Sequence, residues 1–328
     1  MNISSRELLD QLQLPARDTN ADTTSVSRQV DRPWYISFLL GASGWLAGVF
    51  MLIFVALLFK PDSHAALIAC GVILIAAAWG LYKVDREGAF VTQLALAFSI
   101  AGQVLLVAGF AKDSHGIAMP ALIAFLVQTV LVFIMPNALH RTLSALFACI
   151  ALAMAVRYGL FAEAYSFRST ANAAPTLSHA LAGWGLTWLP IAALIFYLIR
   201  DEAQWMARGW QAIARPALSG LIVGLAFGTL ISHPFEMFDW SLRNDVDRGH
   251  LALWPLLSGI AAIAAIAAGF ALKSRALMGI SLIGAILHIS HFYYALGTTL
   301  LLKSLIMAVM GLILLCIAYW LKRGGELA

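Results

Sequence analysis

The sequence predicts an all-α fold, a polytopic bundle of about ten transmembrane helices with both chain ends on the inner side. Composition is the first observation: 61% of the 328 residues are hydrophobic and 12% are charged, whereas a soluble domain has about 25% charged residues. The second observation is the mean hydropathy of +0.85, which also indicates a membrane protein. The third observation is that the apolar residues come in runs of about 20, the length of a helix that crosses a bilayer.

Ten such runs follow one another along the chain. They cover residues 34–59, 64–82, 88–110, 116–135, 141–161, 176–199, 215–232, 251–272, 276–294 and 298–321. The last two are divided at Gly297, because the 27 residues between Arg275 and Lys303 contain no Asp, Glu, Lys or Arg and are too many for one span. The chain therefore divides into a polar segment 1–33, a transmembrane helical domain 34–321 and a tail 322–328.

The positive charges predict the orientation of these spans. With the N-terminus inside, fourteen of the 21 lysines and arginines fall on the inner side and seven on the outer side. Inner loops of membrane proteins carry the excess of Lys and Arg, so we expect an N-in, C-in protein. Segment 1–33 then lies in the cytoplasm, where "SSRELLDQLQL" predicts a short amphipathic helix followed by a linker. That helix either docks on a partner or membrane, or lies against the bundle.

The remaining composition excludes several classes of function. The net charge is +4, but the cations stand one or two at a time between apolar runs, so we expect no nucleic-acid partner. Cys70, Cys149 and Cys316 lie far apart inside apolar runs, which disfavours a disulfide framework or a thiolate metal site. The loops between spans do not exceed about 20 residues, too few to bury the core of a soluble catalytic domain.

One candidate site is a polar cluster at the outer face. Lys303 stands inside an apolar run, and an ionisable residue within a span is a functional hypothesis by default; the alternative is that it snorkels to the headgroups. The stretch "HISHFYYALGTTLLLKS" surrounds it with histidines and tyrosines. The candidate residues of this cluster are Lys303, His288, His291, Tyr293, Tyr294, Asp239, Glu236, His64 and His115.

Each member of that cluster also has a simpler interpretation. Asp239 and Glu236 belong to a loop rich in charges, which solvent alone can stabilise. His288 and His291 are three residues apart on one helical face but lack a carboxylate partner, so we expect no metal and no cofactor. We favour interfacial histidines over metal ligands, and the catalytic residues, if any, stay unknown.

Two similar stretches, "KPDSH" and "KDSHG", are interpreted as helix boundaries. Asp and Ser are preferred N-cap residues, and Lys suits the C-terminal end of a helix. Asp62 and Ser63 precede the second apolar run, and Asp113 and Ser114 precede the fourth. We therefore expect turns that end one helix and cap the next.

Polar and small residues inside the runs are interpreted as packing features. Gln93, Ser99, Gln103 and Gln128 are expected to form hydrogen bonds between helices. In "GASGWLAG", Gly41, Gly44 and Gly48 lie near one face of the first run, which permits another helix to approach closely.

The chain resembles a bacterial inner-membrane family, domain of unknown function 4401, and more loosely the 2157-type membrane proteins. The resemblance rests on "LLDQLQL", "PWYISFLLGASGWLAGVFMLIF", "AKDSHGIAMP" after "QLALAFSIAGQ", and "YYALGTTLLLKS". It implies a multi-pass protein of the bacterial inner (cytoplasmic) membrane, without an assigned activity, found beside small membrane-anchored proteins with a Gly-Asp-Tyr motif. It supplies no catalytic residues.

Three functions follow as hypotheses. The first is an accessory or scaffold subunit of a membrane complex, whose partners are the lipid bilayer and a small membrane-anchored protein. The second is a small-solute transporter or permease, which needs a site near the bilayer midplane. The third is a membrane-embedded enzyme that uses the outer-face His and Asp residues; we do not expect enzymatic activity.

Overall fold

The computed structural model describes residues 34–59, 63–84, 88–112, 116–160, 177–232 and 253–295, with single positions between 301 and 315. Within these ranges the secondary structure is helical and includes no strand, so the all-α prediction is confirmed. The helices are α2 (Trp34–Phe59), α3 (His64–Val84), α4 (Ala89–Ala111), α5 (Ala118–Ile134), α6 (Ala138–Leu160), α7 (Leu177–Arg200), α8 (Glu202–Ala207), α9 (Gln211–Ser232), α11 (Leu253–Ala271) and α12 (Arg275–Ala295).

The helices reproduce the predicted apolar runs with one addition. Nine of the ten runs correspond to a helix whose ends differ from the prediction by a few residues, and the tenth, 298–321, lies outside the described residues except for single positions. The addition is α8, within a segment expected to be a connection between two spans. Its sequence "EAQWMA" is too short and too polar to register as an apolar run.

Several helices have the length and composition of membrane spans. Among the described residues, four helices are long and apolar enough to cross a membrane: His64–Val84, Phe90–Ala111, Ala138–Val156 and Leu181–Arg200. Shorter apolar helical stretches occur at Phe38–Phe54, Ala118–Ile134, Gln211–Phe227, Leu257–Ala271 and Arg275–Ser290. Large apolar side chains also point outward, such as Phe38 and Phe270, which are 70% and 73% exposed. Such a surface suits a lipid environment better than water.

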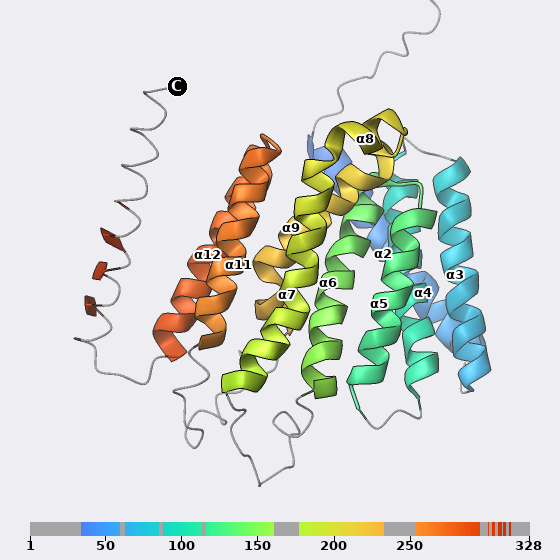
Figure 1. Ribbon diagram of the computed structural model, residues 1–328. Helices are drawn as coiled ribbons and strands as arrows, with labels where there is room; N and C mark the ends of the chain where they lie inside the picture. The colour runs from blue at the N-terminus through green and yellow to red at the C-terminus, as the bar shows by residue number, and fades with distance from the viewer. Residues whose placement is uncertain are drawn as a thin grey trace, which may run out of the picture.

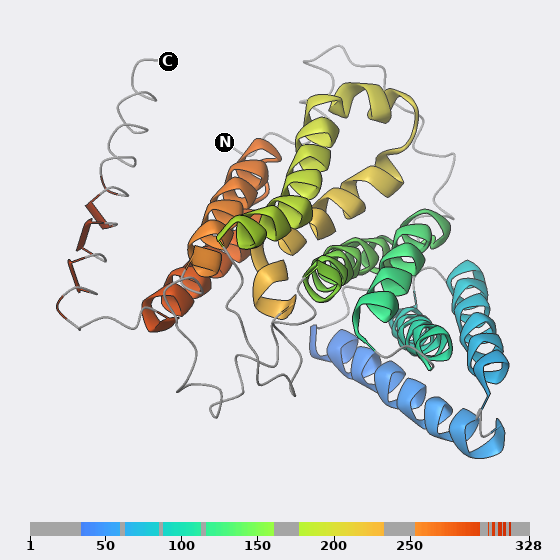
Figure 2. The ribbon, with the colours of Figure 1, turned by 60° about the horizontal axis from the view of Figure 1, so that its bottom comes forward.

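The helices run roughly alongside one another, and α6 lies near the middle of the bundle (Figures 1 and 2). It packs against α5 on one side and α9 on the other. The flank beyond α5 holds α2, α3 and α4, and the opposite flank holds α11 and α12 (Figure 2). α8 and the turn between α11 and α12 lie at the same end of the bundle (Figure 1).

Two groups of buried side chains form the core of these flanks. The larger group joins α6, α7, α9 and α11 around Trp188, Leu218 and Ile222. The smaller group joins α3, α4 and α5 and contains Ala78, Tyr82, Ala95, Leu131 and Met135. The smaller group is the one that borders the polar site described below.

α2 is attached to the bundle by close packing on α4. A Cβ on Gly44 would lie 2.9 Å from the Cβ of Gln93, and a Cβ on Gly48 would collide with Ala97. The predicted close approach through "GASGWLAG" is therefore confirmed. The Trp45 indole N–H also donates a hydrogen bond to Oε1 of Gln93, 3.1 Å away, which fixes the same pair of helices.

Candidate functional site: a buried polar network

Five polar side chains meet inside the bundle between α4, α5 and α6. All are at most 7% exposed although their surroundings are apolar. A polar group that loses water without gaining a hydrogen bond costs free energy, so buried polar side chains require partners. We call this set the polar network: Ser99, Gln103, Gln128, His140 and Ser144.

The network is a continuous chain of hydrogen bonds. The amide nitrogen of Gln128 donates to Oε1 of Gln103 at 2.6 Å, and the amide nitrogen of Gln103 donates to Ser99 Oγ at 3.0 Å. Ser99 Oγ lies 2.7 Å from Nε2 of His140, whose Nδ1 lies 3.2 Å from Ser144 Oγ. Three consecutive helices are thus joined through one set of side chains.

The glutamine donors in this chain point in one direction. Because Ser99 Oγ accepts from Gln103, its own hydrogen is available to donate to Nε2 of His140. The other imidazole nitrogen, Nδ1, shares a hydrogen bond with the Ser144 hydroxyl. Hydrogen bonds aligned in this way polarise one another in a medium of low dielectric constant. A hydrogen on Nδ1 of His140 would continue this direction to Ser144, and a hydrogen on Nε2 would reverse it at Ser99.

Local helix geometry explains how the residues reach one another. Ser99 and Gln103 are four residues apart on α4, as His140 and Ser144 are on α6, so each pair occupies one helical face. His140 is held in the first turn of α6, where its backbone N–H donates to Oδ1 of Asn137 at 3.1 Å. Asn is a preferred N-cap residue, so the cap that starts α6 also positions the imidazole.

Tyr82 of α3 completes the surroundings of His140. The two rings meet edge to face, with centroids 5.9 Å apart and an interplanar angle of 86°. The Tyr82 hydroxyl and Oε1 of Gln128 are buried and have no hydrogen-bond partner among the described residues. These two oxygens are where the site has hydrogen-bonding capacity left for a water molecule or a polar ligand.

Two of the residues proposed for the outer-face cluster have described side chains. His64, half-buried at the start of α3, places Nδ1 2.9 Å from the carbonyl oxygen of Gly109 on α4. His288 is buried in α12, and its Nε2 lies 2.9 Å from the carbonyl oxygen of Ala226 on α9. α3 and α12 lie on opposite flanks of the bundle (Figure 2), so the structure does not bring these two histidines together.

The rest of that cluster remains a prediction. His115, Glu236, Asp239 and Lys303 lie outside the described residues, as do the side chains of His291, Tyr293 and Tyr294 on α12. No group of three or more His, Cys, Asp or Glu that could hold a metal occurs among the described residues.

The turn before α3 has the expected cap. Ser63 Oγ accepts a hydrogen bond from the backbone N–H of Ala66 at 3.1 Å, which confirms the interpretation of this serine as an N-cap. The second turn, with Asp113 and Ser114, lies outside the described residues.

Sequence reasoning found part of the polar network. The expected hydrogen bonds between helices are confirmed for Gln103 and Gln128, and for Gln93 with Trp45. The connection to His140 was missed because His140 and Ser99 are 41 residues apart. The available signal was the coincidence of two (i, i+4) polar pairs, Ser99–Gln103 and His140–Ser144, in runs that are otherwise apolar.

Comparison with known proteins assigns a family but no activity. The profile described as "Domain of unknown function (DUF4401)" matches residues 33–243 and 250–324, most of the chain. No curated protein and no solved structure matches the chain. The match includes all the helices that carry the polar network. The chain therefore belongs to the family of domain of unknown function 4401.

Proposed function

We propose that this protein is a multi-pass protein of the bacterial inner membrane, with about ten spans and both ends inside, and that it acts as an accessory or scaffold subunit of a membrane complex. The apolar helices and the excess of Lys and Arg on one side support the topology. The resemblance to a family found beside small membrane-anchored proteins supports a partner of that kind.

The absence of Asp, Glu, Lys and Arg from the polar network is the observation that carries the scaffold role. Its members are Ser, Gln and His, bonded mainly to one another. The carboxylates among the described residues are Asp201 and Glu202, both at the junction of α7 and α8 rather than inside a span. Ion-coupled transporters commonly use carboxylates within the membrane, and the network contains none, whereas hydrogen bonds of Ser, Gln and His between helices fix their packing. This interior is suited to holding α4, α5 and α6 in one arrangement.

Affinity purification from the native membrane tests the scaffold role. The chain, tagged at its C-terminus and expressed from its own promoter, should retain a partner in constant stoichiometry after extraction in a mild detergent. A variant with Ser99→Ala and His140→Ala should retain less partner, whereas Thr142→Ala, which alters a hydroxyl bonded within α6, should retain as much as the wild type. Recovery of the chain alone under all these conditions would contradict the proposal.

A small-solute permease is the second candidate, and the unpartnered oxygens of Tyr82 and Gln128 favour it. If these oxygens line a path for a polar solute, a cysteine in place of Gln128 should react with small water-soluble thiol reagents in intact membranes. Leu131→Cys, one turn away and also buried, serves as the comparison. Equal protection of both cysteines would argue for a closed interior and hence for the scaffold role.

A further inference from the structure

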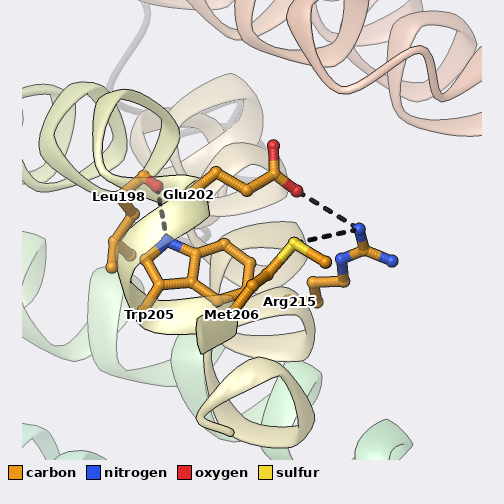
Figure 3. A network of polar contacts seen from close by, with 5 residues as sticks. All are labelled: Leu198, Glu202, Trp205, Met206 and Arg215. Atoms are coloured by element: carbon orange, nitrogen blue, oxygen red, sulfur yellow. Dashed lines mark hydrogen bonds and ion pairs between the residues drawn. The ribbon is translucent and has the colours of Figure 1, made fainter. Parts of the chain in front are cut away.

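The chain turns sharply between α7 and α9 at one end of the bundle (Figure 1). α7 ends at Arg200, and α8 begins two residues later. The side chain of Trp205 is buried, and its indole N–H donates to the carbonyl oxygen of Leu198 at 2.7 Å (Figure 3). This hydrogen bond attaches α8 to the last turns of α7, so the turn has a fixed shape.

The exit from α8 is also fixed by backbone hydrogen bonds. Gly209 has a φ of +74°, a conformation that glycine adopts without steric cost. The N–H of Gly209 donates to the Met206 carbonyl and the N–H of Trp210 to the Trp205 carbonyl, each at 3.0 Å. These are the two hydrogen bonds of a Schellman cap, and α9 starts immediately afterwards at Gln211.

This rigid turn displays three arginines. The side chains of Arg200 and Arg208 are exposed and have no hydrogen-bond or ion-pair partner among the described residues. Arg215 is 59% exposed, and its Nη2 contacts Glu202 Oε1 at 3.2 Å and Met206 Sδ at 3.8 Å. Figure 3 shows the other terminal nitrogen of Arg215 pointing away from both partners. Guanidinium groups bind phosphate oxygens well because their planar donors fit them bidentately.

Apolar and aromatic side chains are exposed on the same segments, and Phe196 and Arg200 are four residues apart on one face of α7. Trp210 is 58% exposed and Met206 40% exposed at the turn itself, and Phe196 and Tyr197 are 66% and 60% exposed on the last turns of α7. Trp and Tyr are characteristic of the boundary between headgroups and acyl chains. The turn thus offers cationic groups next to an apolar helix face, which matches the two chemically different parts of a phospholipid.

We propose that the turn formed by Arg200, Arg208, Trp210 and Arg215 binds the phosphate headgroup of an anionic phospholipid, with the acyl chains along Phe196 and Tyr197. The three arginines outnumber Asp201 and Glu202, the two carboxylates of this turn, so a net charge of +1 favours an anion. The adjoining apolar face favours a lipid over free phosphate. The inference rests on the proposed membrane insertion but not on the scaffold role. Flotation of the reconstituted chain with vesicles tests insertion separately.

The test measures lipid retention by native mass spectrometry. The full chain is purified with phosphatidylglycerol titrated into phosphatidylcholine, and the double variant Arg200→Gln, Arg208→Gln is compared with the wild type. The charge of a basic side chain near a membrane surface contributes about 1 kcal/mol to binding anionic lipid, which is about fivefold in affinity. Each lost arginine should weaken phosphatidylglycerol binding by more than this, because its bidentate hydrogen bonds to phosphate are lost as well, whereas the control should show the charge effect alone. Lys273→Gln with Arg275→Gln is the matched control, since it removes two cations from the α11–α12 turn at the same end (Figure 1).

Equal binding by the wild type and the arginine double variant would overturn the proposal, as would an equal loss in the control. Inorganic phosphate is the second probe. The arginine substitutions could weaken the binding of inorganic phosphate and leave the binding of phosphatidylglycerol unchanged. In that case the ligand is a free anion and the lipid assignment is wrong. Should the glutamine variant fail to fold, Arg200→Lys with Arg208→Lys keeps the charge. It should retain most of the phosphatidylglycerol preference, and complete loss of that preference would contradict a charge-based site.

Discussion

The hydroxyl of Ser99 on α4 and Nε2 of His140 on α6 are joined by a hydrogen bond of 2.7 Å, and both side chains are at most 1% exposed. This bond connects the two halves of the polar network, because Gln103 and Gln128 lie on the side of Ser99 and Ser144 lies on the side of His140. Its loss should therefore affect more groups than the two that form it.

His140→Ala should lower the free energy of unfolding by about 2 kcal/mol, because Ser99 and Ser144 lose their shared partner in a buried environment. A double-mutant cycle with Ser99→Ala should give a coupling energy between about 0.6 kcal/mol, the average for hydrogen bonds between membrane helices, and about 1.7 kcal/mol, the largest value. Unfolding in mixed micelles with increasing dodecyl sulfate measures both. Thr142→Ala should change stability little. If the effects of Ser99→Ala and His140→Ala on the free energy of unfolding simply add in the double variant, the two side chains share no hydrogen bond.

The two glutamines should differ in their contribution to stability. Gln103→Met removes a bond to Ser99 and a bond from Gln128, which leaves the Gln128 amide without its partner and should cost about 1–3 kcal/mol. Gln128→Met removes one bond and also the unpartnered oxygen of Gln128, so its cost should be smaller. The same unfolding assay ranks them. A larger loss for Gln128→Met would show that its oxygen has a partner, such as bound water or a solute.

The sequence predicted the helices far better than it predicted how they meet. Apolar runs locate spans because the bilayer demands about 20 apolar residues for each, and α2 begins and ends as predicted. α8 was missed because its six residues include Glu202 and Gln204 and resemble a polar connection. The contact between Ser99 and His140 depends on how α4 and α6 are rotated, which no local pattern encodes. Only the (i, i+4) pairs within each helix were visible in the sequence.

Lys273→Gly should stabilise the turn between α11 and α12. Lys273 has a φ of +53°, in the left-handed region that costs a non-glycine residue roughly 1–2 kcal/mol. Glycine removes this strain, but its unfolded chain is more flexible, so the net gain should be about 0.5–1 kcal/mol. Lys83→Gly is the control because it also removes one lysine, from the last turn of α3, and should cost about 1 kcal/mol. The unfolding temperatures of the two variants, measured in the same detergent, should shift in opposite directions. A lower unfolding temperature for Lys273→Gly than for the wild type would show that the backbone of Lys273 is not strained.

Cysteine labelling should place α8 and the turn between α4 and α5 on opposite sides of the membrane. Gly116 before α5 and Gln204 on α8 are both exposed. Three helices, α5, α6 and α7, lie between these two positions in the chain. With three spans in between, the N-in orientation puts Gly116 outside and Gln204 inside. In a chain whose own cysteines are replaced, an impermeant maleimide should label Gly116→Cys in intact spheroplasts, and Gln204→Cys only after the membrane is broken. The reverse pattern would invert the topology, and labelling of both in intact cells would contradict an odd number of spans between them.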